Sequence, residues 1–458
     1  MVRCALGAPL EPKLSQADEG SMTVLRQFGH VAVLISRHAR HMTNHHASRA
    51  AGLPSEAEEV SRLRIALVTE TYPPEVNGVA LTVARLARGL LARGHHLQLL
   101  RPRRDSDDVP CEAGMDEHLL PGLPIPRYSE LRMGLPARRR LLRLWRVARP
   151  DVVHIATEGP LGWSALRAAR ELGIPVSSEF RTNFHVYSGH YGIGWLQPLV
   201  TRYLRWFHNS SAITMVPTEG MRSELEALGF ERLRVVGRGV DAERFAPRHR
   251  SASLRAQWGV GDHDPVLLCV GRLAAEKNLD VLLDAWRGVK ARSPASRLVL
   301  VGDGPLRAEL TERFPGVIFA GQRTGEDLAR HYASADLFAF PSMSETWGNV
   351  VTEALASGLP VIAWNRAAAA ELVRTGENGV LVECGDDAGF ADALPSLAHD
   401  LPALRRMGRS ARECALQLGW NGIVEQVESA MVAVSRGGQR PDQTGLSALA
   451  VELGSVPT

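Results

Sequence analysis

Two glutamates, Glu345 and Glu353, flank the start of a predicted helix in the stretch SETWGNVVTEALASG. The first turn of a helix has free backbone N–H groups, which together with the helix dipole favour a bound phosphate. Two carboxylates beside a phosphate would repel it unless each faces a neutral hydrogen-bond donor, and sugar hydroxyls are such donors. A ligand with both phosphates and sugars satisfies all of these groups, so the stretch predicts a nucleotide-sugar site.

Two cations that suit such a ligand, Arg272 and Lys277, follow the predicted strand PVLLCVG in the motif VGRLAAEKN. Cations beside a diphosphate stabilise the negative charge that develops when the bond to the sugar breaks. Either residue alone would as readily be a surface ion-pair partner. Their combination with the glutamate pair makes the functional interpretation the stronger one.

Short aliphatic strands alternate with helical segments from residue 64 onward, a pattern typical of parallel βαβ units. The pattern restarts after a polar stretch at residues 247–264. The sequence therefore predicts an α/β protein with two doubly wound, Rossmann-like domains, residues 63–246 and residues 247–436 with a terminal helix. They should face each other across a cleft, where such folds bind ligands. Residues 1–62 and 437–458 lack this pattern, and we predict that both are disordered.

The composition of the 458-residue chain excludes several classes of protein. Its 45% hydrophobic and 22% charged residues are typical of a globular protein, and a net charge of +3 does not indicate nucleic-acid binding. The five cysteines lack the spacing of a zinc site or a disulfide framework. No apolar run approaches the roughly 18 residues that a membrane span needs. We expect a cytoplasmic protein without a metal site.

On these motifs the chain resembles the family 4 glycosyltransferases of the GT-B fold, from about residue 64 to residue 434. By this resemblance Glu345 faces the transferred sugar, Glu353 holds the ribose, and Arg272 and Lys277 bind the donor phosphates. The loops GDGP and FAGQR resemble those beside the nucleoside base. The resemblance assigns these further residues to donor binding: Asn77, Gly78, Gly302, Gly304, Arg323, Thr346, Trp347, Gly348 and Asn349.

The pair Asn77 and Gly78 is the least specific of these assignments, because Asn-Gly after a strand is often a plain turn. Its position between the first strand and the first helix of a doubly wound domain favours a donor-binding role, since glycine allows the backbone to approach a diphosphate closely.

The segment SSEFRTNFHVY departs from the family pattern. Many relatives have a histidine before the threonine, near the donor sugar, whereas this chain has Arg181 there and His185 four residues later. An arginine stays protonated and cannot act as a general base, so Arg181 in the cleft would only donate hydrogen bonds. We favour this role for Arg181. The alternative is that Arg181 forms a structural ion pair and that His185 lies near the donor.

The resemblance implies a retaining enzyme that moves a hexose from a nucleoside diphosphate to a hydroxyl of a lipid or saccharide acceptor, with mannose from GDP-mannose as the first choice. The leaving phosphate oxygen would take the acceptor proton, so neither a metal nor another cofactor is expected. A UDP-hexose-dependent transferase is the main alternative. A sugar-nucleotide epimerase with the same two-domain architecture is a further one.

Residues 136–150 combine arginines with leucines and a tryptophan in the stretch PARRRLLRLWRVARP. A basic amphipathic helix is suited to an anionic membrane surface, which would place the protein at the inner face of the membrane. The same pattern also fits a helix whose apolar side packs on its own domain.

Overall fold

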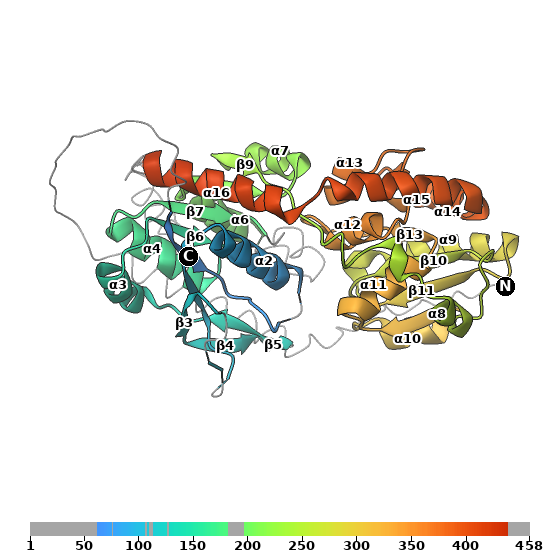
Figure 1. Ribbon diagram of the computed structural model, residues 1–458, viewed down its shortest axis with the longest axis horizontal. Helices are drawn as coiled ribbons and strands as arrows, with labels where there is room; N and C mark the ends of the chain where they lie inside the picture. Colours follow the sequence, from blue (N-terminus) through green and yellow to red (C-terminus); the bar gives the residue numbers. More distant parts are fainter. Residues whose placement is uncertain are drawn as a thin grey trace, which may run out of the picture.

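The computed structural model describes residues 62–75, 77–105, 108–109, 113–125, 128–181 and 197–437. Figure 1 shows two α/β lobes side by side, with one long helix near the C-terminus that runs across the first of them. The predictions of disorder, for residues 1–62 and 437–458, lie outside the described residues except at Arg62 and at Gly437, which ends the helix α16.

The N-terminal domain is built on a seven-stranded parallel sheet with the order β3-β2-β1-β6-β7-β8-β9. Its central strand β1 pairs with β2 on one side and with β6 on the other. A two-stranded antiparallel hairpin, β4-β5, stands beside this sheet. The strands are β1 (Arg64–Val68), β2 (His96–Pro102), β3 (Asp116–Leu120), β4 (Gly122–Ile125), β5 (Tyr128–Gly134), β6 (Val152–Ile155), β7 (Val176–Glu179), β8 (Ile213–Val216) and β9 (Leu233–Val235).

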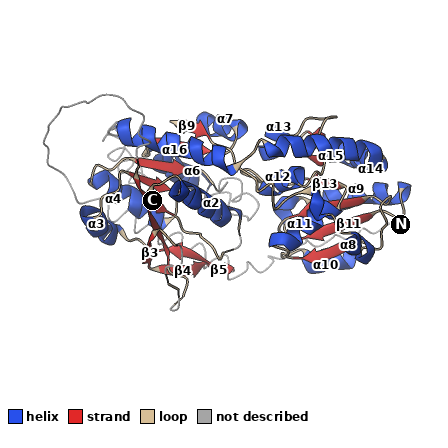
Figure 2. Ribbon diagram, in the orientation of Figure 1, coloured by secondary structure: helices blue, strands red, loops and turns tan. Residues whose placement is uncertain are grey.

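Helices cover the sheet of this domain (Figure 2). In α2, the apolar residues Val83, Leu86 and Leu90 recur at helical spacing and are buried in the core, as the sequence pattern predicts. Asn77 caps α2 by accepting a hydrogen bond from the N–H of Ala80 at 2.8 Å. The helices are α2 (Gly78–Ala92), α3 (Arg138–Val147), α4 (Pro160–Glu171), α6 (Gln197–Asn209) and α7 (Glu219–Ala227).

The C-terminal domain repeats the design with a six-stranded parallel sheet in the order β12-β11-β10-β13-β14-β15. Its strands are β10 (Val266–Val270), β11 (Arg297–Val301), β12 (Ile318–Gly321), β13 (Leu337–Phe340), β14 (Val361–Trp364) and β15 (Gly379–Val382). Its helices are α8 (Ala252–Gln257), α9 (Leu279–Arg292), α10 (Arg307–Arg313), α11 (Gly325–Ser334), α12 (Asn349–Ala356), α13 (Ala367–Leu372), α14 (Asp387–His399) and α15 (Leu401–Leu416).

Each sheet has one point at which the order of its strands reverses. This point lies between β1 and β6 in the first sheet and between β10 and β13 in the second. In doubly wound sheets the loops that follow the two strands at such a point diverge and leave a crevice in which ligands bind. The topology therefore marks one candidate site in each domain.

The last helix, α16 (Trp420–Gly437), belongs to the core of the N-terminal domain. Its side chains Val424, Val427 and Met431 are buried in the same cluster as β1 and α2. Glu428 on the same helix lies 2.8 Å from the buried ring of His95. The domain boundaries predicted from the sequence assigned this helix to the C-terminal domain because it follows that domain in the chain. Its apolar side, however, packs on the first sheet.

The sequence pattern did not reveal five strands, β3, β4, β5, β9 and β15. The edge strand β3 reads DEHLL and is too polar for the aliphatic pattern. Their partners in the sheets, rather than their own composition, make these segments strands.

We expect that Met431→Ala destabilises the N-terminal domain by about 2–5 kcal/mol, because it leaves a cavity where a fully buried side chain had packed. Urea unfolding should show a lower midpoint. The exposed residue Glu425 on the same helix provides the control, since Glu425→Ala should change stability by less than about 0.5 kcal/mol. An unchanged midpoint for Met431→Ala would contradict the packing of α16 on this domain.

Candidate active site

A lysine and a glutamate meet where the strand order of the C-terminal sheet reverses. Lys277 ends a short 3-10 helix after β10, and Glu345 lies in the loop between β13 and α12. The ammonium of Lys277 forms an ion pair with Glu345 Oε1, and the hydroxyl of Ser342 donates to the same oxygen at 2.8 Å. Only 14% of the Lys277 side chain and 20% of the Glu345 side chain is exposed, so the pair is shielded but reachable.

The charge of Lys277 fixes the protonation state of Glu345. Burial opposes ionisation of this carboxyl, but the charge of Lys277 and the hydrogen bonds from Lys277 and Ser342 lower its pKa below the ordinary value. Glu345 is therefore a carboxylate at neutral pH. Lys277 also lies 5.7 Å from the centre of the Phe340 ring, a cation–π contact that holds the ammonium in place.

The start of α12 is open to an anion. Gly348 occupies the N-cap position with a φ of 93°, and no side chain caps this end of the helix. The positive φ favours glycine, which also leaves the first N–H groups uncovered. Asn349, Thr346 and the buried Trp347 complete the loop. This loop contains the residues that the sequence assigned to the donor phosphates.

Glu353 lies further along α12 and is held by a tyrosine. The hydroxyl of Tyr332 on α11 donates to Glu353 Oε2 at 2.9 Å. Burial raises the pKa of Glu353 to about 7, although this hydrogen bond and the nearby charge of Arg244 oppose the shift. Glu353 and Glu345 therefore differ in protonation at neutral pH.

The remaining predicted residues of this domain surround the ends of β10, β11 and β12. A side chain at Gly302 or Gly304 would overlap the backbone of the loop after β10, so both positions require glycine. Arg272 is 38% exposed and lies 3.8 Å from Glu276. Arg323, after β12, forms an ion pair with Asp327 at 3.1 Å and does not contact the lysine–glutamate pair.

The N-terminal domain contacts the same loop. The hydroxyl of Thr346 donates to the backbone oxygen of Arg181 at 3.2 Å, which links the loop before α12 to the end of β7. A Cβ atom at Gly78 would lie 3.3 Å from the amide of Asn349, and one at Gly237 would lie 3.3 Å from the ring of Trp347. Gly78 at the start of α2 thus lies directly opposite the start of α12.

The side chain of Arg181 is buried rather than exposed to this junction. It forms an ion pair with Glu179, which also lies 2.9 Å from the ring nitrogen Nε2 of His154. Burial opposes ionisation of Glu179, but the charges of Arg181 and His154 lower the pKa of this carboxyl to about 2. This is the ion pair that the alternative interpretation of Arg181 required. His185, its counterpart in that alternative, lies outside the described residues.

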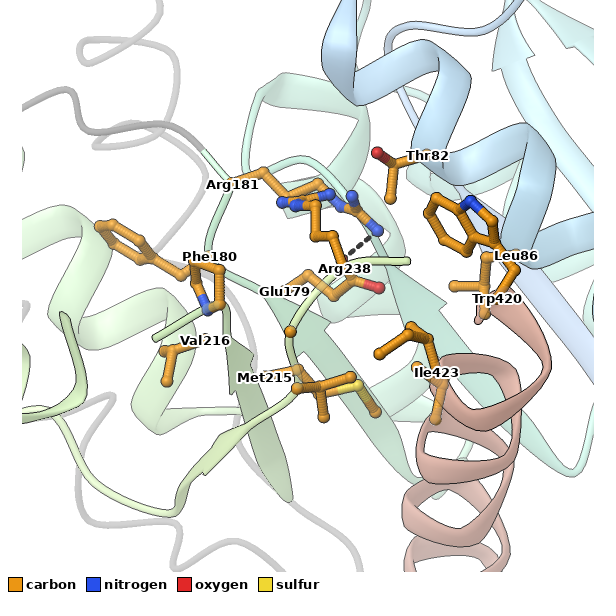
Figure 3. Close-up of a pocket in the computed structure, with 14 residues that line it drawn as sticks. Thr82, Leu86, Glu179, Phe180, Arg181, Met215, Val216, Arg238, Trp420 and Ile423 are labelled. Atoms are coloured by element: carbon orange, nitrogen blue, oxygen red, sulfur yellow. Dashed lines mark ion pairs between the residues drawn. The ribbon is translucent and has the colours of Figure 1, made fainter. Parts of the chain in front are cut away.

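Arg181 and Arg238 both border a pocket of about 20 Å³ between α2, α16 and the ends of β7, β8 and β9 (Figure 3). Burial lowers the pKa of Arg238 to about 9, and the neighbouring charge of Arg181 adds to this effect. The pocket has room for about one water molecule. It is too small for a sugar or a nucleotide.

Sequence reasoning missed two groups that shape the site, Ser342 and Tyr332, and also the buried Glu158 of the N-terminal domain. Ser342 ends the predicted strand FAFPS and carried no signal of its own. Tyr332 is fully buried on α11, and only the packing of α11 against α12 shows that its hydroxyl reaches Glu353. The buried Glu158, after β6, looked like an ordinary loop residue.

Comparison with known proteins defines the class of the chain. The family model for Glycosyltransferase Family 4 matches residues 76–244, and the model for Glycosyl transferases group 1 matches residues 264–400. A GDP-mannose-dependent alpha-mannosyltransferase from Mycobacterium tuberculosis is 35% identical over 369 residues, which cover 80% of this chain and 95% of that protein. The chain therefore belongs to the family 4 glycosyltransferases and is a glycosyltransferase enzyme.

Two further likenesses agree with this assignment. A sulfoquinovosyl transferase from Arabidopsis thaliana is 31% identical over 315 residues, 67% of this chain and 61% of that protein. The structure of a sucrose-phosphate synthase from Thermosynechococcus elongatus superposes with a TM-score of 0.67 at 21% identity and covers 81% of this chain and 99% of that one. The predicted GT-B fold, with two Rossmann-like domains, is thus confirmed.

The pKa of Glu353 predicts that nucleotide binding depends on pH. If Glu353 holds the ribose, as expected from the sequence, the ribose hydroxyls donate best to its ionised carboxyl. Binding of a nucleotide such as GDP should then release a proton below about pH 7 and strengthen as the pH rises to that value. In the protein without ligand, the free energy of unfolding depends on pH in the opposite direction. Between about pH 4.5 and 7 the Glu353 carboxyl keeps its proton in the folded protein but loses it in the unfolded protein. The contribution of Glu353 to the free energy of unfolding therefore declines as the pH rises through that range.

Calorimetric titration of GDP at pH 6, in buffers of different ionisation enthalpy, measures this proton release. Glu353→Gln should abolish the release and weaken binding, whereas Glu326→Gln on the exposed side of α11 should change neither. Proton release that persists in Glu353→Gln would assign the effect to another group.

Proposed function

We propose that this protein is a retaining hexosyltransferase that transfers mannose from GDP-mannose to a hydroxyl of a lipid or saccharide acceptor. The observation that carries the proposal is the ion pair of Lys277 with Glu345 beside the uncapped start of α12. It puts a fixed cation, a fixed carboxylate and free N–H groups at one end of one sheet. A diphosphate attached to a sugar needs all three.

In this proposal the donor diphosphate binds the N–H groups at the start of α12, and Lys277 binds it from the opposite side. Lys277 would keep its ion pair with Glu345 while its positive charge attracts the phosphate oxygens. Arg272, which is partly exposed after β10, adds a second cation. These charges stabilise the diphosphate as the bond to the sugar breaks.

Glu345 would face the hydroxyls of the transferred sugar. Because Lys277 keeps this carboxyl ionised, it accepts hydrogen bonds and has no proton to donate. The proton of the acceptor hydroxyl would then pass to the leaving phosphate oxygen on the same face of the sugar. This route gives retention of configuration and requires neither a protein base nor a metal.

The choice of GDP-mannose rests on the relatives. Curated proteins from Mycobacterium tuberculosis, Mycolicibacterium smegmatis and Corynebacterium glutamicum, 33–35% identical to the chain, are described as GDP-mannose-dependent. A UDP-hexose remains the alternative, because the sulfoquinovosyl relative shows that a protein at 31% identity transfers a different group. The epimerase alternative is not favoured, since the matching family and the named relatives are glycosyltransferases.

Helix α3 supports a peripheral membrane contact as part of the same proposal. Its apolar residues Leu141, Leu142 and Trp145 pack inward, whereas Arg139 and Arg143 are exposed. Apart from Val147, its exposed last residue, the helix presents charge, so its attraction to anionic lipid would be mainly electrostatic. None of the helices that the structure describes is both long and apolar enough to cross a membrane.

Donor identity is tested with a thermal-shift panel of GDP, UDP and ADP, because a nucleotide at 100 times its Kd stabilises a protein by about 2.7 kcal/mol. We expect the largest shift with GDP. Incubation with GDP-mannose and an acceptor in the presence of EDTA should release GDP and form an α-mannoside, as NMR of the product would show. A larger shift with UDP would favour the alternative donor, and a new sugar nucleotide from donor alone would favour the epimerase.

Comparison of Lys277→Ala with the control variant Arg287→Ala tests whether Lys277 belongs to the donor site. Lys277→Ala should weaken GDP binding and also slow turnover, because the diphosphate gains charge in the transition state. Arg287→Ala, which removes an exposed cation from α9, should leave both unchanged. GDP affinity at the wild-type level in Lys277→Ala would remove Lys277 from the donor site.

We expect the double variant Arg139→Glu/Arg143→Glu to weaken sedimentation with phosphatidylcholine vesicles that contain phosphatidylglycerol by about tenfold or more, because each basic residue near the surface contributes about 1 kcal/mol. High salt should have the same effect on the wild type. The control double variant Arg287→Glu/Arg292→Glu on α9 should sediment with the vesicles as the wild type does. Equal vesicle binding by all three proteins would refute the role of α3.

A further inference from the structure

The pocket between α2, α16 and the ends of β7 and β9 is lined by two arginines and otherwise mainly by apolar side chains (Figure 3). Arg181 borders it from just after β7, and Arg238 borders it from the segment after β9. Both residues are buried, with 4% and 7% of their surface exposed. The pocket volume of about 20 Å³ admits one particle of about the size of a water molecule. Any occupant is therefore small and lies next to two cations.

Both arginines have donors to spare. Nη2 of Arg181 is paired with Glu179, whereas its Nε and Nη1 are buried and make no hydrogen bond with the residues that the structure describes. The side chain of Arg238 forms neither an ion pair nor a hydrogen bond within that part of the chain. A buried donor without an acceptor costs free energy, and the cost is larger for a charged group. The two guanidinium groups therefore lack an acceptor at the pocket that they share.

The carboxyl groups near the pocket do not balance the two cations. Burial opposes the ionisation of Glu179, but the charges of Arg181 and His154 lower its pKa to about 2, so it contributes one negative charge. Glu158 also acts on Arg181, but burial raises the pKa of Glu158 to about 8, so it is mostly uncharged at neutral pH. The segment that follows Arg181, residues 182–196, contains no aspartate or glutamate. One positive charge at the pocket is left without a partner.

We propose that this pocket is an anion site and holds one halide ion, such as chloride, between Arg181 and Arg238. A chloride ion is only slightly larger than a water molecule and accepts hydrogen bonds from several donors without donating any. Its charge balances the second arginine, and an unbalanced buried charge is costly. A water molecule would fit but would leave that charge unbalanced, and a phosphate is too large. The inference does not depend on the proposed transfer reaction.

The site lies where the N-terminal domain meets the loop before α12. The backbone oxygen of Arg181 accepts the hydrogen bond from the hydroxyl of Thr346 at 3.2 Å. Gly237, the neighbour of Arg238, lies so close to Trp347 that a Cβ atom there would be 3.3 Å from its ring. An ion between the two arginines therefore joins the two segments that contact this loop, and we expect it to stabilise the folded protein.

Thermal unfolding of the full chain in sodium chloride, and at equal concentration in sodium gluconate, tests the site, because gluconate is too large for the pocket. Chloride should raise the Tm of the wild type by about 2 °C or more over gluconate, in a saturable way. In Arg238→Met, which keeps a long side chain without its charge, this difference should vanish. Arg287→Met, which removes an exposed arginine from α9, should keep the wild-type difference.

Bromide locates the ion directly, because a crystal of the wild type grown in sodium bromide should show an anomalous peak between Arg181 and Arg238. No such peak, with equal Tm in chloride and gluconate, would overturn the proposal and leave water as the occupant. A chloride effect of full size in Arg238→Met would place the ion elsewhere. If Arg238→Met does not fold, or if the two measurements disagree, the presence or absence of the bromide peak decides the question.

Discussion

The contact between Lys277 and Glu345 is the interaction on which the candidate active site depends. An isolated carboxylate in this shielded position would be costly, and the charge of Lys277 keeps Glu345 in its charged form. The loops that carry them follow β10 and β13, which lie side by side in the sheet although about 70 residues separate them in the sequence. The parallel sheet brings the two loops together, and besides the ion pair a backbone hydrogen bond from the N–H of Met343 to the oxygen of Glu276 at 3.1 Å joins them.

The loop before α12 serves both domains. It presents the uncapped start of the helix to a ligand and also contacts the ends of α2 and β7 in the N-terminal domain. Helix α16 reinforces this arrangement, because it leaves the C-terminal domain and packs in the core of the other one. A change in the angle between the domains would therefore alter the contacts of Thr346 and Trp347, which lie in the loop before α12.

Buried charge is distributed differently in the two domains. The C-terminal site pairs one cation with one carboxylate and leaves N–H groups free for an anion. In the N-terminal domain, Arg181, Arg238, Glu179 and His154 form a buried network, and the carboxyls of Glu70 and Glu158 lie beside it. The first arrangement suits the diphosphate of the proposed donor.

The sequence by itself determined the α/β class, the two Rossmann-like domains and the family, because strand runs, helical spacing and the motif SETWGNVVTEALASG are local in the chain. It also indicated Lys277, Glu345 and Glu353 as a group. Only the tertiary structure placed α16 on the first sheet, paired Arg181 with Glu179, and brought Tyr332 to Glu353 and Glu158 close to Glu70. These relations join residues far apart in sequence, and they depend on burial and on strand order, which no single segment encodes.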